Sequence, residues 1–259
     1  IRWYVLAAVI WTFWNSFNDP FIGYLSDRTN TRFGRRKPYI MIGTIPMLIL
    51  EIILWLPPTN NQLTIFIYLL IMLICYDTFY TMIALPFDSL FPELYTSVKE
   101  RSEVNTIKQL LAVLGLLAAA LVPGFIVDSD AMSYLLNGIV TSVIVGISLI
   151  ISLKWGVKER KEFKMDYQQS FKFFEGLKYT LKNKGFVLYT IIFFLYEYVI
   201  LLLATLVQIF GKEILNATEF ETSIIMGIMY IMGAISVVLW RWLDIKIGSR
   251  KGLALSVVA

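Results

Sequence analysis

The sequence predicts an all-α protein that crosses a membrane several times, and two observations carry this prediction. Apolar residues gather in blocks of about 20, the length that an α-helix needs to span a hydrocarbon core of about 30 Å. Of the 259 residues, 58% are hydrophobic and only 16% are charged, and the mean hydropathy is +0.68. Soluble domains carry about 25% charged residues, so this chain has too little polar surface for a water-soluble domain. In lipid, apolar runs of this length satisfy their backbone groups as helices.

Seven complete spans are predicted, and an eighth begins near Gly252. The seven spans cover residues 3–25, 38–56, 63–86, 106–127, 133–153, 186–210 and 222–242. The chain starts without an initiator Met or a charged signal-peptide region and ends in an apolar run. We therefore expect it to be a segment of a longer membrane protein.

Lys and Arg are distributed unevenly between the connections. Twenty-one of the 23 lie in or beside alternate connections, whereas the intervening connections hold only Lys212. Cytoplasmic loops of membrane proteins carry an excess of Lys and Arg. The sequence therefore predicts a multi-pass protein of the cell membrane whose cytoplasmic connections are residues 26–37, 87–105, 154–185 and 243–251.

The longest connection, 154–185, is polar and basic at first and then amphipathic. Phe171, Phe174, Leu177 and Leu181 recur at helical spacing among lysines, which predicts an amphipathic helix on the inner membrane surface. The segment is interpreted as a linker between two membrane halves. A basic patch that binds anionic lipid is the alternative.

A weak internal repeat also indicates two halves. GYLSDRTNTRFGRRK closes the first span and RWLDIKIGSRKG closes the seventh. The two sequences are six spans apart, which is the offset expected from two fused halves of about six helices each. Chance similarity is the alternative. We predict membrane helices of an N-terminal half in residues 1–153, a cytoplasmic linker in 154–185 and the start of a C-terminal half in 186–259.

A group of polar residues interrupts the first span. Asn15, Asn18 and Asp19 are spaced so that they share one helix face. Pro20 cannot donate a backbone hydrogen bond and clashes with the carbonyl of Ser16, which is left under-satisfied beside these side chains. Ionisable residues inside spans are costly and mark functional sites. Oxygen ligands of this kind suit Na⁺, or a carboxylate that binds a proton; a carboxylate that packs against a neighbouring span is the alternative.

The third span carries a second polar group. Asp77 and Thr81 are four positions apart, with Tyr80 beside them. A carboxylate, a hydroxyl and an aromatic ring that face a cavity can hold a polyhydroxylated ligand. The alternative is a buried Asp77 paired with Lys108 of the fourth span. Glu197, near the middle of the sixth span, is placed to contribute from the opposite half.

The connection after the first span has a different composition. Gly23 permits close approach of another helix, and Asp27 can pair with Arg28, with a later Arg or with helix N-termini of the other half. Such pairs can latch one closed state of two rocking halves; solvated charges that only set topology are the alternative. The predicted gating residues are Gly23, Asp27, Arg28, Arg32, Gly34, Arg35 and Arg36.

This connection also resembles that of a known family. Gly23 to Tyr39 reads G-x-L-x-D-R-T…R-x-G-R-R-K-P-Y, which is similar to the signature loop of the major facilitator superfamily. The preceding N-D-P, the stretch YTMIALPFDSL in the third span and TLKNKGF before the sixth resemble the glycoside-pentoside-hexuronide:cation symporters, the melibiose-permease-like branch. The resemblance covers nearly the whole chain. It implies a major-facilitator-type bundle of twelve helices in two halves, of which the chain holds spans two to eight and the start of span nine.

The resemblance implies roles for individual residues. The cation site of that family has the pattern D-x-x-N-D, which reads here Asn15, Asn18 and Asp19, so the first carboxylate is an amide. The threonine of the family's cation site corresponds to Thr81. The sugar-binding aspartate corresponds to Ala84, which is a second departure from the pattern.

The resemblance also indicates a substrate role for two further residues, with Asp77 expected to compensate for the missing aspartate at Ala84. Asp77 lies two turns before Ala84 on roughly the same face, and Lys108 lies near the place of a basic sugar-site residue. The predicted substrate-binding residues are Asp77, Tyr80, Lys108 and Glu197.

We therefore expect a secondary active transporter that couples the symport of a sugar or glycoside to a cation or proton by alternating access. A related carrier of a non-sugar or amphiphilic solute and a non-transporting helical membrane protein are the alternatives. The chain has no histidine and no nucleophile–base arrangement, which argues against an enzyme. No cofactor is expected beyond a coupling Na⁺ or H⁺ at Asp19. The expected partners are a small-molecule solute and the bilayer, not nucleic acid, and the expected state is a monomer.

Overall fold

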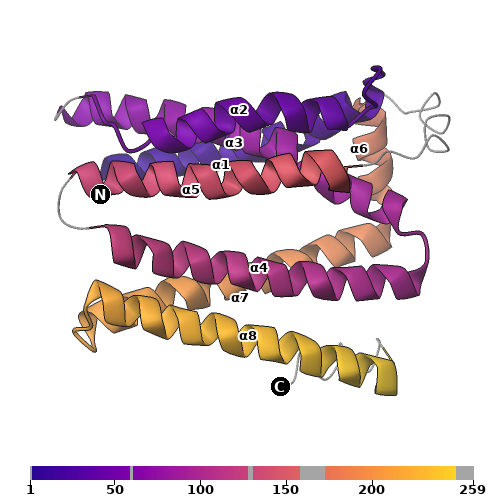
Figure 1. The fold of residues 1–259 in the computed structure, drawn as a ribbon. Coiled ribbons are helices and arrows are strands. Elements are labelled where there is room, and N and C mark those ends of the chain that lie inside the picture. The colour runs from indigo at the N-terminus through magenta and orange to yellow at the C-terminus, as the bar shows by residue number, and fades with distance from the viewer. Residues whose placement is uncertain (1, 59–60, 128–130, 158–172, 249–259) are drawn as a thin grey trace. The chain divides into compact units, whose positions relative to one another are not determined.

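The computed structural model describes residues 2–58, 61–127, 131–157 and 173–248, and these are almost entirely helical. The elements are α1 (Arg2–Arg28), α2 (Lys37–Ile53), α3 (Gln62–Leu94), α4 (Val98–Ile126), α5 (Ala131–Ile151), the π-helix η1 (Ser152–Gly156), α6 (Phe173–Lys182), α7 (Lys184–Glu213) and α8 (Glu219–Ile247) (Figure 1). Each of the seven predicted spans falls on one of these helices. The prediction of an all-α fold is confirmed.

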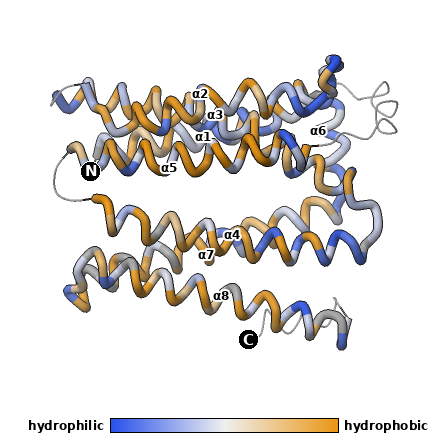
Figure 2. The backbone as a smooth tube through the Cα atoms, in the orientation of Figure 1, coloured by the Kyte–Doolittle hydropathy of each residue, from blue (hydrophilic) through white to orange (hydrophobic). Residues whose placement is uncertain are grey.

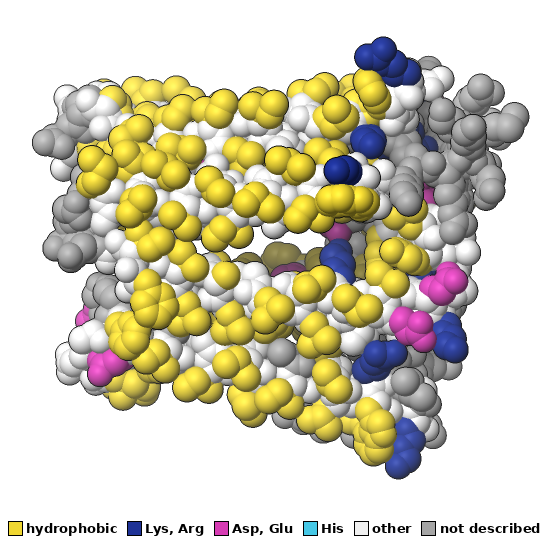
Figure 3. Space-filling view, in the orientation of Figure 1, with side chains coloured by type: hydrophobic (Ala, Val, Ile, Leu, Met, Phe, Trp, Pro, Cys, Tyr) yellow, Lys and Arg dark blue, Asp and Glu magenta, His cyan; other side chains and the backbone are white. Residues whose placement is uncertain are grey.

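Among the described residues, five helical stretches are long and apolar enough to cross a membrane. They are Gln62–Leu94, Lys99–Ile126, Met132–Gly156, Lys184–Gly211 and Phe220–Leu243. The hydrophobic residues along α4 and α5 are visible in Figure 2. α2 is shorter, with 17 residues. α1 is a continuous helix, but polar side chains interrupt its apolar sequence. Hydrophobic side chains cover much of the helix surfaces in Figure 3, as lipid-facing helices require. The chain is a multi-pass membrane protein.

The helices extend further than the apolar blocks, so the predicted connections are partly helical, and their cytoplasmic location stays a prediction. The connection 87–105 is mostly helical, because α3 continues to Leu94 and α4 begins at Val98. Likewise, α8 continues to Ile247 into the predicted connection 243–251. A change from apolar to polar residues marks the membrane surface, but a helix keeps its backbone hydrogen bonds in water and need not end there.

The contacts divide the described chain into two compact units. The first contains residues 1–96 and 126–173, and the second contains residues 97–125 and 174–259. α4 therefore groups with α7 and α8, whereas α5 groups with α1, α2 and α3. The predicted division into transporter halves at 153 and 186 stays a prediction.

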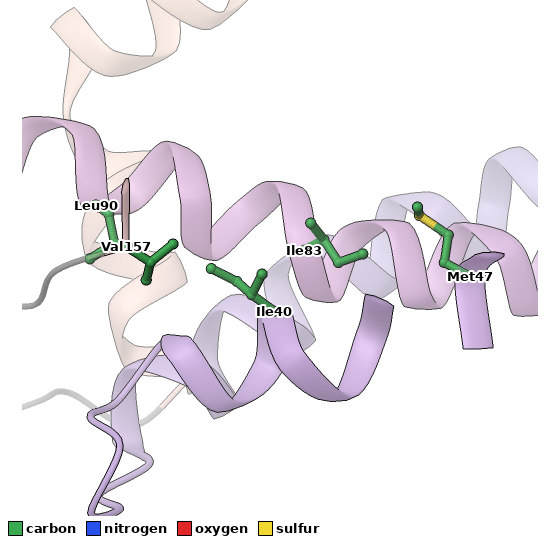
Figure 4. Packing of buried hydrophobic residues seen from close by; sticks show 5 residues of the cluster. All are labelled: Ile40, Met47, Ile83, Leu90 and Val157. Carbon is green, nitrogen blue, oxygen red and sulfur yellow. The ribbon is translucent and has the colours of Figure 1, made fainter. Parts of the chain in front are cut away.

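The first unit is built around α3, which packs against both α1 and α2, while α2 also packs against α5. Its apolar core consists of Ile40, Met47, Ile83, Leu90 and Val157 (Figure 4). α2 and α3 approach closely because Gly43 has no side chain: a Cβ there would lie 2.9 Å from the carbonyl oxygen of Phe79. Small residues allow this kind of close packing between membrane helices.

In the second unit, α7 packs against α8. Gly211 of α7 lies beside Thr222 of α8, since a Cβ on Gly211 would be 3.3 Å from the threonine hydroxyl. α7 begins at a capped terminus, where the Asn183 side chain accepts hydrogen bonds from the backbone N–H groups of Gly185 and Phe186. Such a cap satisfies backbone donors that have no partner within the helix.

The predicted amphipathic helix is present in part as α6. Phe174, Leu177 and Leu181 of α6 are exposed, as a helix that lies on a membrane surface requires. Phe171 and the basic residues 158–170 lie outside the described residues. A position on the inner membrane surface stays a prediction.

Candidate cation site

Polar side chains of α1 and α3 meet inside the first unit. α1 contributes Asn15, Asn18 and Asp19 from one face, because residues three and four positions apart are neighbours on a helix. α3 contributes Asp77 and Thr81. Asn18, Asp77 and Thr81 are only 4%, 6% and 3% exposed. These five residues, called the α1–α3 cluster below, therefore lie largely between the helices rather than on their outer surfaces.

Hydrogen bonds join the α1–α3 cluster continuously. The Nδ2 of Asn15 donates to Oδ1 of Asp77 at 2.8 Å. The Nδ2 of Asn18 donates to Oδ2 of Asp77 at 3.2 Å and to Oγ1 of Thr81 at 3.1 Å. The Thr81 hydroxyl in turn donates to Oδ1 of Asp19 at 2.8 Å. Two carboxylates are thus connected through an amide and a hydroxyl.

The charges of the α1–α3 cluster are unbalanced. Its donors are amides and a hydroxyl, and within the described part of the chain neither Asp19 nor Asp77 takes part in a salt bridge. An ionised carboxylate accepts at about four lone-pair sites, and the hydrogen bonds above use two on Asp77 and one on Asp19. Oxygen atoms with free lone pairs and negative charge are ligands for hard cations and acceptors for protons.

The structure brings together Asn15, Asn18, Asp19 and Thr81, the four residues predicted for a cation site. It also places Asp77 in this cluster, although the sequence assigns Asp77 to substrate. The roles themselves stay predictions.

The other three predicted substrate residues do not take part in these hydrogen bonds. Tyr80 is 53% exposed on α3. Lys108 on α4 and Glu197 on α7 belong to the second unit. Their contribution to a substrate site stays a prediction.

A second charged cluster lies where α1 and α3 end and α2 begins. Arg35 Nη2 donates to Glu93 Oε1 at 2.8 Å, and Arg36 Nη1 lies 2.7 Å from the same oxygen. Arg36 Nη2 donates to Asp27 Oδ1 at 3.1 Å. Asp27, Arg35, Arg36 and Glu93, called the ion-pair cluster below, thereby connect α1, the connection before α2, and α3. The side chains of both arginines and of Glu93 are about nine-tenths buried.

Glu93 is the member of the ion-pair cluster that sequence reasoning missed. The prediction placed residue 93 in a cytoplasmic connection, where a solvated carboxylate needs no partner. The available signal was a carboxylate in the stretch FPEL at the end of the third apolar block, which the structure shows as the last turn of α3.

The remaining predicted gating residues shape the connection between α1 and α2. Gly34 has a φ of 110°, in the region that favours glycine, and its backbone pairs with that of Thr31 through two hydrogen bonds. Arg28 lies over the ring of Tyr24 and Arg32 over the ring of Phe33. At the α1–α3 contact, a Cβ on Gly23 would lie 3.3 Å from Leu85, so this glycine permits close approach of the two helices.

A sequence model described as MFS/sugar transport protein matches residues 2–259. The chain belongs to the MFS/sugar transport protein family. The predicted resemblance to the major facilitator superfamily is therefore confirmed. The family consists of transport proteins, which also confirms the prediction that the chain is not an enzyme.

Individual relatives of the chain are named as transporters or symporters, and the solutes that some of these names give differ. The chain is 23% identical to the isoprimeverose transporter of Lactiplantibacillus pentosus, over 98% of this chain and 56% of the relative. It is 22% identical to the sodium-dependent lysophosphatidylcholine symporter 1-A of Danio rerio, over 94% of this chain and 52% of the relative. It is 29% identical to the uncharacterized symporter YnaJ of Bacillus subtilis, over 68% of this chain and 39% of the relative. The chain thus spans about half the length of the curated relatives that it matches almost throughout.

Proposed function

We propose that the protein is a secondary active symporter that couples solute transport to the movement of Na⁺ or H⁺ by alternating access. The observation that carries this proposal is the α1–α3 cluster, in which Asp19 and Asp77 are joined through Asn18 and Thr81 without a salt-bridge partner among the described residues. Carboxylates placed within membrane helices mark ion and proton pathways.

In the proposed cycle the coupling ion binds at Asp19. This residue is half-buried and accepts one hydrogen bond, from Thr81, so that lone pairs of its carboxylate remain available. Binding of the ion lowers the negative charge between α1 and α3. If the ion raises the affinity for the solute by a given factor, the solute raises the affinity for the ion by the same factor.

The ion-pair cluster is proposed to hold one closed state on the cytoplasmic side. Arg36 contacts both Asp27 and Glu93, so separation of the ends of α1 and α3 would break ion pairs on both sides of one guanidinium. Breaking a buried ion pair is costly, which suits a contact that must hold firmly until the halves rock. The cytoplasmic location of this end rests on the excess of Lys and Arg in the connections.

A sugar or glycoside is the proposed solute, supported by the isoprimeverose transporter among the relatives. An amphiphilic solute is the second candidate. It is supported by the lysophosphatidylcholine symporter among the relatives and by Ala84, which stands where the resembling sugar symporters carry an aspartate. Replacing a carboxylate by a methyl group removes an acceptor for sugar hydroxyl groups, so this position favours a less polar ligand.

Transport in proteoliposomes tests the proposal. The purified protein is given an imposed Na⁺ or proton gradient and a panel of labelled pentosides, hexosides and lysophosphatidylcholine. One solute is expected to accumulate under one gradient, and Asp19→Asn is expected to abolish accumulation while exchange of labelled solute across the membrane continues. Accumulation that does not depend on either gradient, or that is unchanged in Asp19→Asn, would overturn the proposal.

A further inference from the structure

We infer that Asp77 supplies the second carboxylate of the cation site, in place of the carboxylate that Asn15 lacks. The inference rests on the proposed function and assigns a specific role in it. Asp77 is then a ligand of the coupling ion and not of the transported solute. The cation would be a hard monovalent ion such as Na⁺. It would lie between a carboxylate of α1 and a carboxylate of α3.

The first argument is the position of Asp77 relative to Asn15. The two side chains are in direct contact, with Asn15 Nδ2 2.8 Å from Asp77 Oδ1. An amide and a carboxylate have nearly the same size and shape. A negative charge at residue 77 therefore lies within one hydrogen bond of the place where a carboxylate at residue 15 would put it.

The second argument is the direction of the Asp77 carboxylate. Oδ1 accepts from Asn15 and Oδ2 accepts from Asn18, so both oxygens are turned toward α1. The backbone carbonyl of Asp77 also lies 3.5 Å from the Asn18 Nδ2. With only 6% of the residue exposed, the carboxyl group is committed to the interface between α1 and α3.

The third argument is the connection between the two carboxylates. Asn18 donates to Asp77 and to Thr81, and Thr81 donates to Asp19. Two ionised carboxylates joined through one amide and one hydroxyl repel each other, and a cation between them replaces this repulsion by two attractions. Because each carboxylate comes from a different helix, cation binding would change the force between α1 and α3 directly.

The amide at Asn15 is thereby explained. A third carboxylate beside Asp19 and Asp77 would add a further unit of negative charge for a single monovalent ion to balance. Asn15 instead donates a hydrogen bond to the Asp77 carboxylate. The site therefore has two carboxylates, as in the D-x-x-N-D pattern, but one of them comes from α3 instead of α1.

An exchange of the two side chains tests the inference. Na⁺ binding to the purified protein is measured by calorimetry, with proton uptake in weak buffer as the parallel readout. Asp77→Asn is expected to weaken Na⁺ binding about tenfold or more, since it removes a unit charge in contact with the ion. The double variant Asn15→Asp with Asp77→Asn is expected to restore affinity to within about threefold of the wild type, because the charge returns to the same pair of positions.

Asp88→Asn is the matched control, because Asp88 is an exposed carboxylate on the same helix and its loss is expected to leave Na⁺ binding unchanged. If Asp77→Asn does not fold, the exchanged double variant decides: folding with Na⁺ binding supports the inference, and folding without binding overturns it. Unchanged Na⁺ affinity in Asp77→Asn overturns the inference alone. A wild-type protein that binds neither Na⁺ nor protons overturns the proposed function as well.

Discussion

Asn15 of α1 donates a hydrogen bond of 2.8 Å to the carboxylate of Asp77 on α3, although the two residues are 62 positions apart in the sequence. This contact places a carboxylate of the third span beside the polar face of the first. It brings the residues predicted for an ion and a residue predicted for a solute into one cluster.

The hydroxyl of Thr81 is predicted to be required for cation binding. It accepts from Asn18 and donates to Asp19, so its loss interrupts the hydrogen bonds between the two carboxylates. Thr81→Val keeps the shape of the side chain and is expected to lower Na⁺ affinity about tenfold, the effect of losing about 1.4 kcal/mol of interaction with a charged group. Calorimetric titration of the purified protein measures the change.

Thr81→Ser is the corresponding control, because it retains the hydroxyl and removes only a methyl group. Its Na⁺ affinity is expected to stay within about threefold of the wild type. Equal affinities in the Val and Ser variants would show that the hydroxyl plays no part in cation binding.

Glu93→Gln is predicted to destabilise the protein. The substitution removes the negative charge between Arg35 and Arg36, which lie 2.8 Å and 2.7 Å from its carboxylate. Removing one partner of a buried ion pair leaves an uncompensated charge and costs about 3–5 kcal/mol. A lower midpoint of thermal unfolding in detergent is therefore expected.

Glu103→Gln on α4 is the comparison for Glu93→Gln, because residue 103 is exposed. Its unfolding midpoint is expected to match that of the wild type, since exposed charges contribute little. A Glu93→Gln protein that unfolds at the same temperature as Glu103→Gln would contradict the assignment of Glu93 to a buried ion-pair cluster.

Gly43→Ala is predicted to destabilise the packing of α2 on α3. The added Cβ would lie 2.9 Å from the Phe79 carbonyl oxygen and 3.1 Å from Ile83, and neither the backbone nor the core side chain can move freely. Overpacking of this kind costs about 1–3 kcal/mol. Thermal unfolding of the purified protein provides the measurement.

Gly115→Ala on α4 serves as the control for Gly43→Ala. Apart from the adjacent backbone of α4 itself, no atom of the described residues lies within 4 Å of the added Cβ at residue 115. Alanine is also the better helix former by about 1 kcal/mol. The unfolding midpoint of Gly115→Ala is expected to be unchanged or higher. Equal effects of the two substitutions would contradict the close approach of α2 and α3.

The existence of the helices could be predicted from the sequence, because apolar blocks of membrane-spanning length dictate helices wherever they occur. The ends of the helices could not be predicted in the same way. Leu94 ends α3 well beyond the apolar block, since a polar sequence in water is compatible with a helix. The buried position of Glu93 cannot be predicted for this reason, because its sequence context does not distinguish the last turn of α3 from a connection.

The composition of the cation site could be predicted only within one helix. The shared face of Asn15, Asn18 and Asp19 follows from helical periodicity, and the structure shows these residues together. The contact between Asn15 and Asp77 depends on which helices pack side by side and on their relative height. The spacing of residues within a single span predicts neither which helices are neighbours nor their relative height.

The continuity of α3 gives the two charged clusters a common backbone. Asp77 and Glu93 lie on the same helix, separated by about 24 Å at 1.5 Å per residue. Pro86 and Pro92 lie between them, and each lacks the N–H that would close one helical hydrogen bond, so the helix bends most easily at these two positions. A displacement of α3 at Asp77 would therefore be transmitted to Glu93 along one continuous helix, reduced by any bending at these two prolines.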